Sequence, residues 1–172
     1  MRELRGAGVL DAAALKWFAL SAVVVVADYL TKIAVLGSFA PGESRAITPF
    51  FNLVLVFNKG AAFSFLATAE GWQTVLFAGI AIVASFIIGF LILRNRGKRL
   101  LCTGLALILG GALGNLYDRL VYGKVVDFLD FYALGVHFPA FNVADSAITL
   151  GAGILIAESF MHGKEGHDEK RA

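Results

Sequence analysis

The chain has 172 residues, 58% of them hydrophobic, and its mean hydropathy is +0.76. Soluble domains are only about 45–50% apolar, so this composition indicates an integral membrane protein. The net charge of +2 is small, and the basic residues lie at the ends of apolar segments instead of between aromatic residues, which argues against nucleic-acid binding. The single cysteine, Cys102, excludes an intramolecular disulfide.

Four apolar segments are long enough to cross a bilayer as helices, which takes about 17–25 residues each. The amino terminus has the basic start and apolar run of a signal peptide, but the run continues past Asp28 and Lys32 to Leu36, so we expect a retained span. The polar residues 162–172 are expected to form a disordered tail. The expected spans are residues 17–36, 72–93, 100–122 and 143–160.

The distribution of lysine and arginine predicts the orientation, because basic residues near span ends are retained in the cytoplasm. Ten of them lie before the first span, between the second and third, or after the fourth, and only three lie in the opposite loops. Both termini are therefore expected in the cytoplasm. The loops 37–71 and 123–142 are expected on the outer side.

The first outer loop is longer than a connector needs. Its segment from Ile47 to Phe57 is rich in β-branched and aromatic residues with partial alternation, which predicts short antiparallel strands. The residues from Asn58 to Gly60 are a turn signal, and residues 61–69 are expected to form a short helix at the membrane interface. We expect this loop to cap the outer ends of the spanning helices.

Small residues recur at four-residue spacing in the last two spans. Gly110 and Gly114 form one such pair in the third span, and Ala147 and Gly151 form another in the fourth. Residues of this size at this spacing let helix backbones approach closely. We expect close packing here to bring the ends of the helices that carry aspartates together.

Two aspartates flank the connection between the last two spans. Asp127 lies before it and Asp145 just after it. A carboxylate at the edge of an apolar phase is costly unless it is paired, hydrogen-bonded or functional, and two close together force their pKa values apart. This is the arrangement that general acid/base chemistry needs. Asp130 is a rival, but strand alternation points it to the face opposite Asp127.

Two further pairs of polar residues lie four positions apart inside spans. Asp28 and Lys32 share one helix face, and they predict an ion pair, the lining of a polar cavity, or both. Asn115 and Arg119 lie near the end of the third span. Snorkelling of the arginine to the interface does not explain Asn115 one turn deeper, so we favour a buried network.

Asn142 and Asp145 begin the fourth span, where helix capping is an equally good interpretation. Capping does not explain Asp127.

Other chemistries fit less well. A Ser-Lys nucleophile pair is disfavoured because Ser64 lies in an apolar run. No metal site is expected, because ligand spacing is lacking among His137, His162, His167 and Cys102.

Five short motifs combine these polar residues with small and aromatic neighbours. They are DYLTK at 28–32, NKGAAFS at 58–64, GGALGNLYDR at 110–119, VVDF at 125–128 and FNVADS at 141–146. In composition and order they resemble the motifs of the lipoprotein signal peptidases, the signal peptidase II family of bacterial membrane aspartyl proteases. The resemblance runs from about Leu15 to Phe160, and five motifs in the family's order make it specific.

The resemblance implies four transmembrane helices with an outer β-cradle and an interfacial helix, in the bacterial inner membrane, with the active site at the periplasmic face. It implies an endopeptidase that removes the signal peptide from a diacylglyceryl-modified prolipoprotein, on the amino side of the modified cysteine. Expected partners are this substrate and membrane lipids. No cofactor is expected, and the expected state is a monomer.

The resemblance also assigns roles to particular residues. It makes Asp127 and Asp145 the catalytic dyad. The recurrent polar and small positions around the active site are Asp28, Lys32, Asn58, Gly60, Asn115, Arg119 and Asn142.

Two other classes of function remain as alternatives. A proton-coupled transporter would use Asp28, Asp127 and Asp145 as relay sites, which should lie near the middle of the bilayer. A structural membrane subunit, whose aspartates only cap and pair, predicts that asparagine at positions 127 and 145 keeps function.

Overall fold

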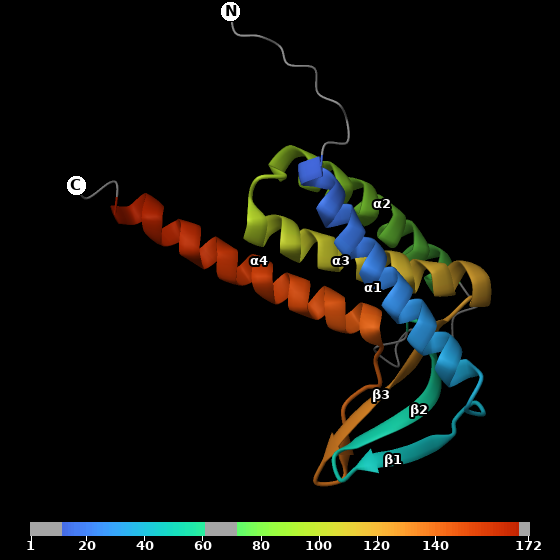
Figure 1. Cartoon of the computed structure of the whole chain (residues 1–172). Coiled ribbons are helices and arrows are strands. Elements are labelled where there is room, and N and C mark those ends of the chain that lie inside the picture. The colour runs from blue at the N-terminus through green and yellow to red at the C-terminus, as the bar shows by residue number, and fades with distance from the viewer. Residues whose placement is uncertain (1–11, 61–71, 169–172) are drawn as a thin grey trace, which may run out of the picture.

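The computed structural model describes residues 12–60 and 72–168, with side chains as far as residue 161. Within these residues the chain forms four long helices and one four-stranded antiparallel sheet (Figure 1). The helices are α1 (Ala12–Leu36), α2 (Trp72–Asn95), α3 (Arg99–Tyr122) and α4 (Val143–Asp168).

Each of the four helices is long and apolar enough to cross a membrane, which confirms the four expected spans. The largest difference is at the carboxyl end, where α4 continues beyond the expected boundary at residue 160 to Asp168. Residues 162–168 are therefore helical, and the prediction of disorder was wrong for them. Propagation of an existing helix adds one hydrogen bond for each residue fixed, and no proline stops it here.

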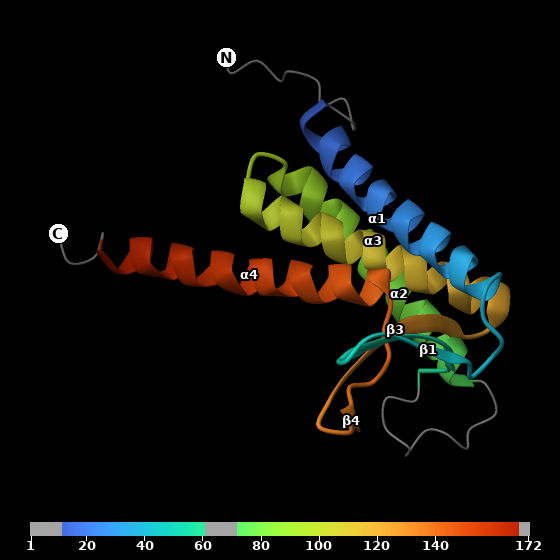
Figure 2. The same ribbon diagram turned by 60° about the horizontal axis from the view of Figure 1, so that its bottom comes forward.

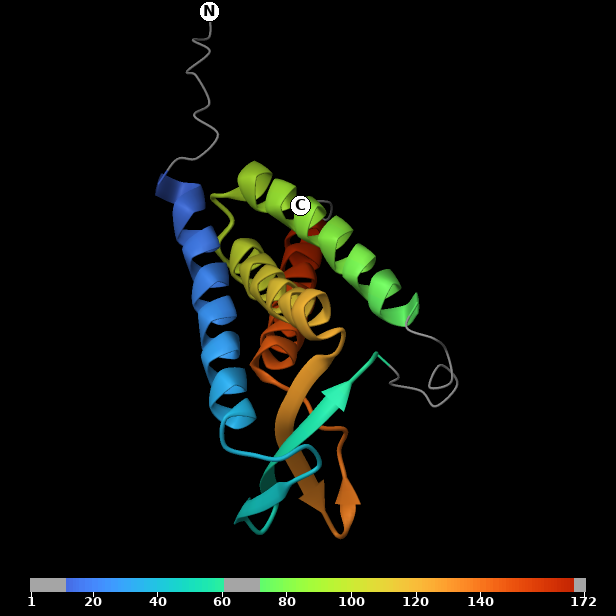
Figure 3. The same cartoon turned by 90° about the vertical axis from the view of Figure 1, so that its right-hand side faces the viewer.

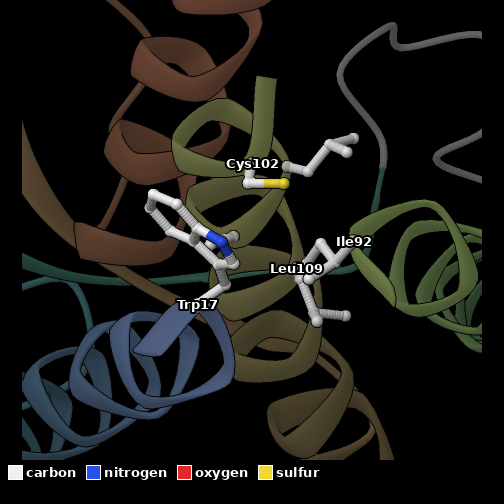
Figure 4. Packing of buried hydrophobic residues seen from close by; sticks show 6 residues of the cluster. Trp17, Ile92, Cys102 and Leu109 are labelled. Carbon is white, nitrogen blue, oxygen red and sulfur yellow. The ribbon is translucent and has the colours of Figure 1, made fainter. Parts of the chain in front are cut away.

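Helix α3 lies at the centre of the bundle, with α1, α2 and α4 packed around it (Figure 3). More than half of its span is buried, against 17–28% for the other three. One apolar cluster joins α1, α2 and α3 around Trp17, Ile92, Cys102 and Leu109 (Figure 4). Burial of α3 leaves α1, α2 and α4 to face the lipid.

Glycines allow the close approach of α3 to two of its neighbours. A Cβ atom added to Gly110 would lie 2.7 Å from the backbone oxygen of Ser21 in α1. On the other side, a Cβ added to Gly151 of α4 would lie 2.6 Å from the backbone oxygen of Gly104. Two of the small residues singled out by spacing thus lie at helix contacts, as the sequence predicts.

The sheet lies at the end of the bundle where α1 ends and α4 begins (Figure 1). Its order is β1-β2-β3-β4, and the β1–β2 hairpin confirms the strands expected within residues 47–57. The helix expected at residues 61–69 lies outside the described residues. The β3–β4 hairpin extends away from the helices (Figure 2). The strands are β1 (Ser44–Thr48), β2 (Phe51–Asn58), β3 (Val125–Ala133) and β4 (Val136–His137).

An apolar cluster attaches the sheet to the helices. Val35, in the last turns of α1, packs with Leu55 of β2 and with Val126 and Phe128 of β3. These four side chains are at most 6% exposed. The attachment holds β3, which carries Asp127, against the helix ends.

Candidate active site

Asp127 and Asp145 meet at the junction of the sheet and the bundle. Asp127 is on β3 and is only 1% exposed, whereas Asp145, in the first turn of α4, is partly buried. Asn142 contacts both carboxylates. Its side-chain Nδ2 donates a hydrogen bond to Asp127 Oδ1 at 2.7 Å, and its backbone nitrogen donates to Asp145 Oδ2 at 3.3 Å. One residue therefore links the two predicted catalytic groups.

The same asparagine caps α4. Asn142 Oδ1 accepts a hydrogen bond from the backbone nitrogen of Asp145 at 2.9 Å, so the two residues satisfy each other's amides in the manner of a capping box. The capping interpretation is thus confirmed. It is compatible with a role in a site, because the Nδ2 atom of Asn142 stays available for Asp127.

Asn115 of α3 contacts both Asp145 and Asn142. Its Nδ2 donates to Asp145 Oδ1 at 2.7 Å, and its Oδ1 accepts from Asn142 Nδ2 at 3.1 Å. Arg119, one turn later, donates to the backbone oxygen of Asn115 at 3.3 Å and lies over the ring of Phe77, 5.4 Å from its centre. The expected network around Asn115 is therefore present.

Lys32 is the centre of a buried ion-pair cluster behind the dyad. Its Nζ lies 2.7 Å from Asp28 Oδ2 and 2.8 Å from Asp118 Oδ2, and it also donates to Asn115 Oδ1 at 3.2 Å. The side chains of the three charged residues are at most 3% exposed. The expected pairing of Asp28 with Lys32 is confirmed, and it is part of a larger arrangement.

Asp118 is a member of this cluster that the sequence did not predict. Its Oδ2 accepts a hydrogen bond at 3.0 Å from the backbone nitrogen of Val126, the residue before Asp127. Its position three residues after Asn115 was the available signal, since residues three apart share a helix face.

Asn58 and Gly60 approach Asp127 from the end of β2. The side chain of Asn58 hydrogen-bonds to Asp127. Gly60 N donates to Asn58 Oδ1 at 2.8 Å, which leaves the amide nitrogen of Asn58 for the carboxylate. Gly60 has a φ of 90°, and an added Cβ would lie 2.5 Å from the ring of Phe77. Only glycine fits this turn without strain.

The surroundings of Asp127 favour its protonated form. Burial and, to a smaller extent, the negative charge of Asp145 raise the pKa of Asp127 to about 7, although the hydrogen bonds from Asn58 and Asn142 oppose the rise. Near neutral pH a proton is therefore readily held by Asp127. A buried carboxyl that keeps its proton beside a second, less buried carboxylate can serve acid and base steps together.

An apolar cleft of about 460 Å³ opens beside Asp145. Asp145 is its only ionisable lining residue among those described, and the lining follows α4 from its first turn towards the exposed Leu150. The cleft thus connects the carboxylate to the lipid-facing surface of α4. Its lining residues are Phe138, Phe141, Asp145, Ser146, Thr149 and Leu150.

The other candidate groups lie away from the dyad. Asp130 bonds to Asn52 and His137, in keeping with the expected orientation. Cys102 is in the apolar cluster around Trp17, near the start of α3. Ser64 is outside the described residues, as are the side chains of His162 and His167.

Two solved structures share this fold, and both are described as bacterial membrane enzymes. One has a TM-score of 0.77 at 28% identity and covers 87% of this chain and 90% of its own. The other has a TM-score of 0.75 at 29% identity and covers 83% of this chain and 91% of its own. This chain therefore has the fold of a bacterial membrane enzyme.

The model of the family described as signal peptidase (SPase) II matches residues 20–161, and the chain belongs to this family. Similar relatives include the lipoprotein signal peptidase of Ralstonia nicotianae, 58% identical over 142 residues that cover 83% of this chain and 82% of the relative. The lipoprotein signal peptidase of Cupriavidus necator is also 58% identical, over 144 residues that cover 84% of this chain and 82% of the relative.

Proposed function

We propose that this protein is an aspartic endopeptidase that removes the signal peptide from lipid-modified bacterial prolipoproteins, with Asp127 and Asp145 as its dyad. The observation that carries the mechanism is the bridge through Asn142, which holds a buried carboxyl and a less buried one in a single hydrogen-bonded unit. The membership of the chain in the signal peptidase II family supports the substrate class.

The environments of the two carboxyl groups favour one division of roles. Asp127 carries the proton, because burial and the charge of Asp145 raise its pKa. Asp145 is the base that takes a proton from water as the water oxygen attacks the scissile carbonyl carbon. Asp127 gives its proton to the carbonyl oxygen. Collapse of the tetrahedral intermediate then breaks the carbon–nitrogen bond. The leaving amine receives the proton from Asp145, and one hydroxyl group of the intermediate returns a proton to Asp127.

The surrounding residues hold this unit in place. Asn115 fixes Asp145 and Asn142 fixes Asp127, so neither carboxylate can rotate without losing a hydrogen bond of 2.7 Å. Asn58 supports Asp127 from β2. The positive charge of Arg119 acts on both members of the dyad and limits the cost of the negative charge. In this mechanism no metal or organic cofactor takes part.

The membrane setting suits a substrate that is itself embedded in lipid. We propose that the cut falls on the amino side of the lipid-modified cysteine, as the resemblance to the family implies. The apolar cleft at Asp145 reaches the exposed surface of α4, so an apolar part of the substrate can enter from the bilayer. We place the sheet and the dyad at the periplasmic face of the inner membrane, in accordance with the basic residues.

The position of the dyad also favours a peptidase over a transporter. Asp127 lies on a strand of the sheet and Asp145 in the first turn of α4. Proton relay groups would be expected near the middle of the helices.

Comparison of a diacylglyceryl-modified precursor peptide with the same peptide lacking the lipid tests the proposed function. Purified protein in detergent should cut the modified peptide once, before the cysteine, and should leave the unmodified peptide intact. Mass spectrometry of the products locates the cut. Equal cleavage of both peptides, or a cut elsewhere, would be inconsistent with the proposed substrate.

A further inference from the structure

A second polar cluster lies in the sheet, and the proposed mechanism does not use it. Asp130, on β3, is 7% exposed. Its Oδ2 accepts a hydrogen bond from Asn52 Nδ2 of β2 at 2.8 Å, and Nδ1 of His137 on β4 lies 2.9 Å from both of its carboxylate oxygens. The ring of His137 also stacks on the ring of Tyr132, with centres 5.0 Å apart. This cluster joins three strands through side chains.

The strand that carries His137 has little other support. β4 contains only two residues, which pair with Tyr132 and Ala133 of β3. The turn before it places Leu134 at a φ of 51°, a conformation that is costly for a residue with a side chain. So short a ladder provides few backbone hydrogen bonds. The contact of His137 with Asp130 therefore adds a side-chain link between β4 and β3.

Asp130 is suited to hold that link. Burial opposes its ionisation, but the hydrogen bonds from Asn52 and His137 and the charge of His137 lower the pKa of the Asp130 carboxyl below its usual value. An ionised carboxylate accepts hydrogen bonds more strongly than a neutral one. The side chain of His137 is more than half exposed, so its own position depends on its partners.

The residues that follow His137 form one wall of the cleft at Asp145. Phe138 N donates to the backbone oxygen of Phe131 at 2.8 Å, and Phe141 forms a bridge with Leu129. The rings of Phe138 and Phe141 meet edge to face, 6.0 Å apart, and both line the cleft. A displacement of β4 would therefore move a wall of the cleft.

We propose that Asp130 and His137 are a positioning pair for the substrate. By holding β4 against β3, they fix Phe138 and Phe141 and so determine how an apolar part of the substrate fits beside Asp145. This inference rests on the proposed function. Because neither residue contacts the reacting atoms, their loss should weaken substrate binding more than it slows the chemical step.

The test compares three variants with wild type in cleavage of the diacylglyceryl-modified precursor. His137→Ala removes the donor to Asp130, whereas His137→Asn keeps a donor nitrogen close to the position of Nδ1. Arg45→Gln is the matched control, since it breaks an exposed ion pair between Arg45 of β1 and Glu43, which precedes that strand, away from the cleft. KM and kcat are measured for each, together with Tm in detergent. Affinity for the uncut precursor is measured in an Asp127→Asn background.

His137→Ala should raise KM and weaken precursor binding by about fivefold, the ratio that corresponds to a net hydrogen-bond free energy of about 1 kcal/mol. Its kcat should stay close to that of wild type, and its Tm should fall by no more than the roughly 2–4 °C that 1 kcal/mol corresponds to in a chain of this size, whereas His137→Asn and Arg45→Gln should behave as wild type. An unchanged KM in His137→Ala, no rescue by asparagine, or a joint collapse of kcat and Tm would overturn the inference alone. Failure of wild type to bind or cut the precursor would overturn the proposed function as well.

Discussion

Asp28 of α1 accepts a hydrogen bond at 2.9 Å from the backbone nitrogen of Ala144, which lies 116 positions further along the chain and directly precedes Asp145. Asp118 does the same for Val126, which directly precedes Asp127. Both carboxylates are paired with Lys32. One buried lysine therefore connects the backbone segments that precede Asp127 and Asp145, the two proposed catalytic groups.

Two substitutions of Asp28 should distinguish the contribution of its hydrogen bond from the contribution of its charge. Asp28→Asn keeps an oxygen that can accept from Ala144 but loses the charge that faces Lys32. Asp28→Leu loses both and leaves a buried amide without a partner, which costs about 1–3 kcal/mol. We expect the leucine variant to lose more activity and more thermal stability than the asparagine variant. Equal losses in cleavage assays and melting curves would mean that the charge alone matters.

Removal of Lys32 should be the most destabilising of the charge substitutions. Lys32→Met leaves Asp28 and Asp118 buried without their shared cation, and breaking a buried ion pair costs about 3–5 kcal/mol. Loss of an exposed pair costs at most about 1 kcal/mol, so Arg45→Gln is the matched comparison. Unfolding in detergent followed by tryptophan fluorescence measures both. Similar stabilities of the two variants would refute a structural role for the buried cluster.

Neutralisation of either member of the dyad should abolish cleavage without unfolding the protein. Positioned acid and base groups contribute about 10²- to 10⁴-fold each, so Asp127→Asn and Asp145→Asn should lose at least that much kcat. Glu43→Gln changes a partly exposed carboxylate just before β1, and this control should keep full activity. Folded asparagine variants that still cleave would favour the interpretation in which these aspartates only cap and pair.

The rate of cleavage should fall as the pH rises through about 7, because Asp127 then loses the proton that it gives to the carbonyl oxygen. Stability should change in the same direction. The pKa of Asp127 is raised in the folded protein, so its contribution to stability is complete below the unfolded pKa of about 3.9 and is lost as the pH rises through about 7. A profile of kcat/KM against pH and melting curves across this range test both.

The Asp145→Asn variant provides an independent check on this assignment. It removes the negative charge that helps to raise the pKa of Asp127 and leaves burial as the main cause, so this pKa should fall. The carboxyl stretching band of Asp127 in infrared spectra reports its protonation directly. A titration midpoint that is the same in the variant and in wild type would show that the two groups are not coupled.

Replacement of Gly114 even by alanine should reduce activity and stability. An added Cβ would lie 2.7 Å from Asp28 Oδ2, so Gly114→Ala should displace Asp28, reduce activity and cost about 1–3 kcal/mol of stability. Gly79 of α2 has no atom within 4 Å of the corresponding position. Gly79→Ala should therefore be neutral or stabilise the helix by up to about 1 kcal/mol. Cleavage rates and melting temperatures of the two variants make the comparison.

The spans could be predicted well because the lipid requires long apolar helices, and this requirement is visible in every one of the four segments. The β1–β2 hairpin was also accessible, since it depends on local alternation and a nearby turn. The pairing of β2 with β3 was not predicted. It joins Asn52 to Asp130, and no local pattern specifies a register between strands so far apart in sequence.

In the candidate site, too, some features could be predicted from the sequence and others could not. The resemblance to a family identified Asp28, Lys32 and Asn142, and the structure brings them together with the dyad. Which atoms they contact could not be predicted, because each contact joins different helices or strands. Asp118 illustrates the difficulty. Beside Arg119 it has the pattern of a surface residue, and only its pairing with Lys32 of α1 shows that it is buried.

The reciprocal bonds between Asn142 and Asp145 have a consequence for inhibitors. A compound that takes the place of the backbone nitrogen of Asn142 as the donor to Asp145 Oδ2 removes a hydrogen bond that holds the first turn of α4 closed. Binding of this kind is therefore coupled to fraying of a spanning helix. Such a compound should accelerate hydrogen exchange at the amide of Asn142, whereas one that occupies only the apolar cleft should leave that amide protected.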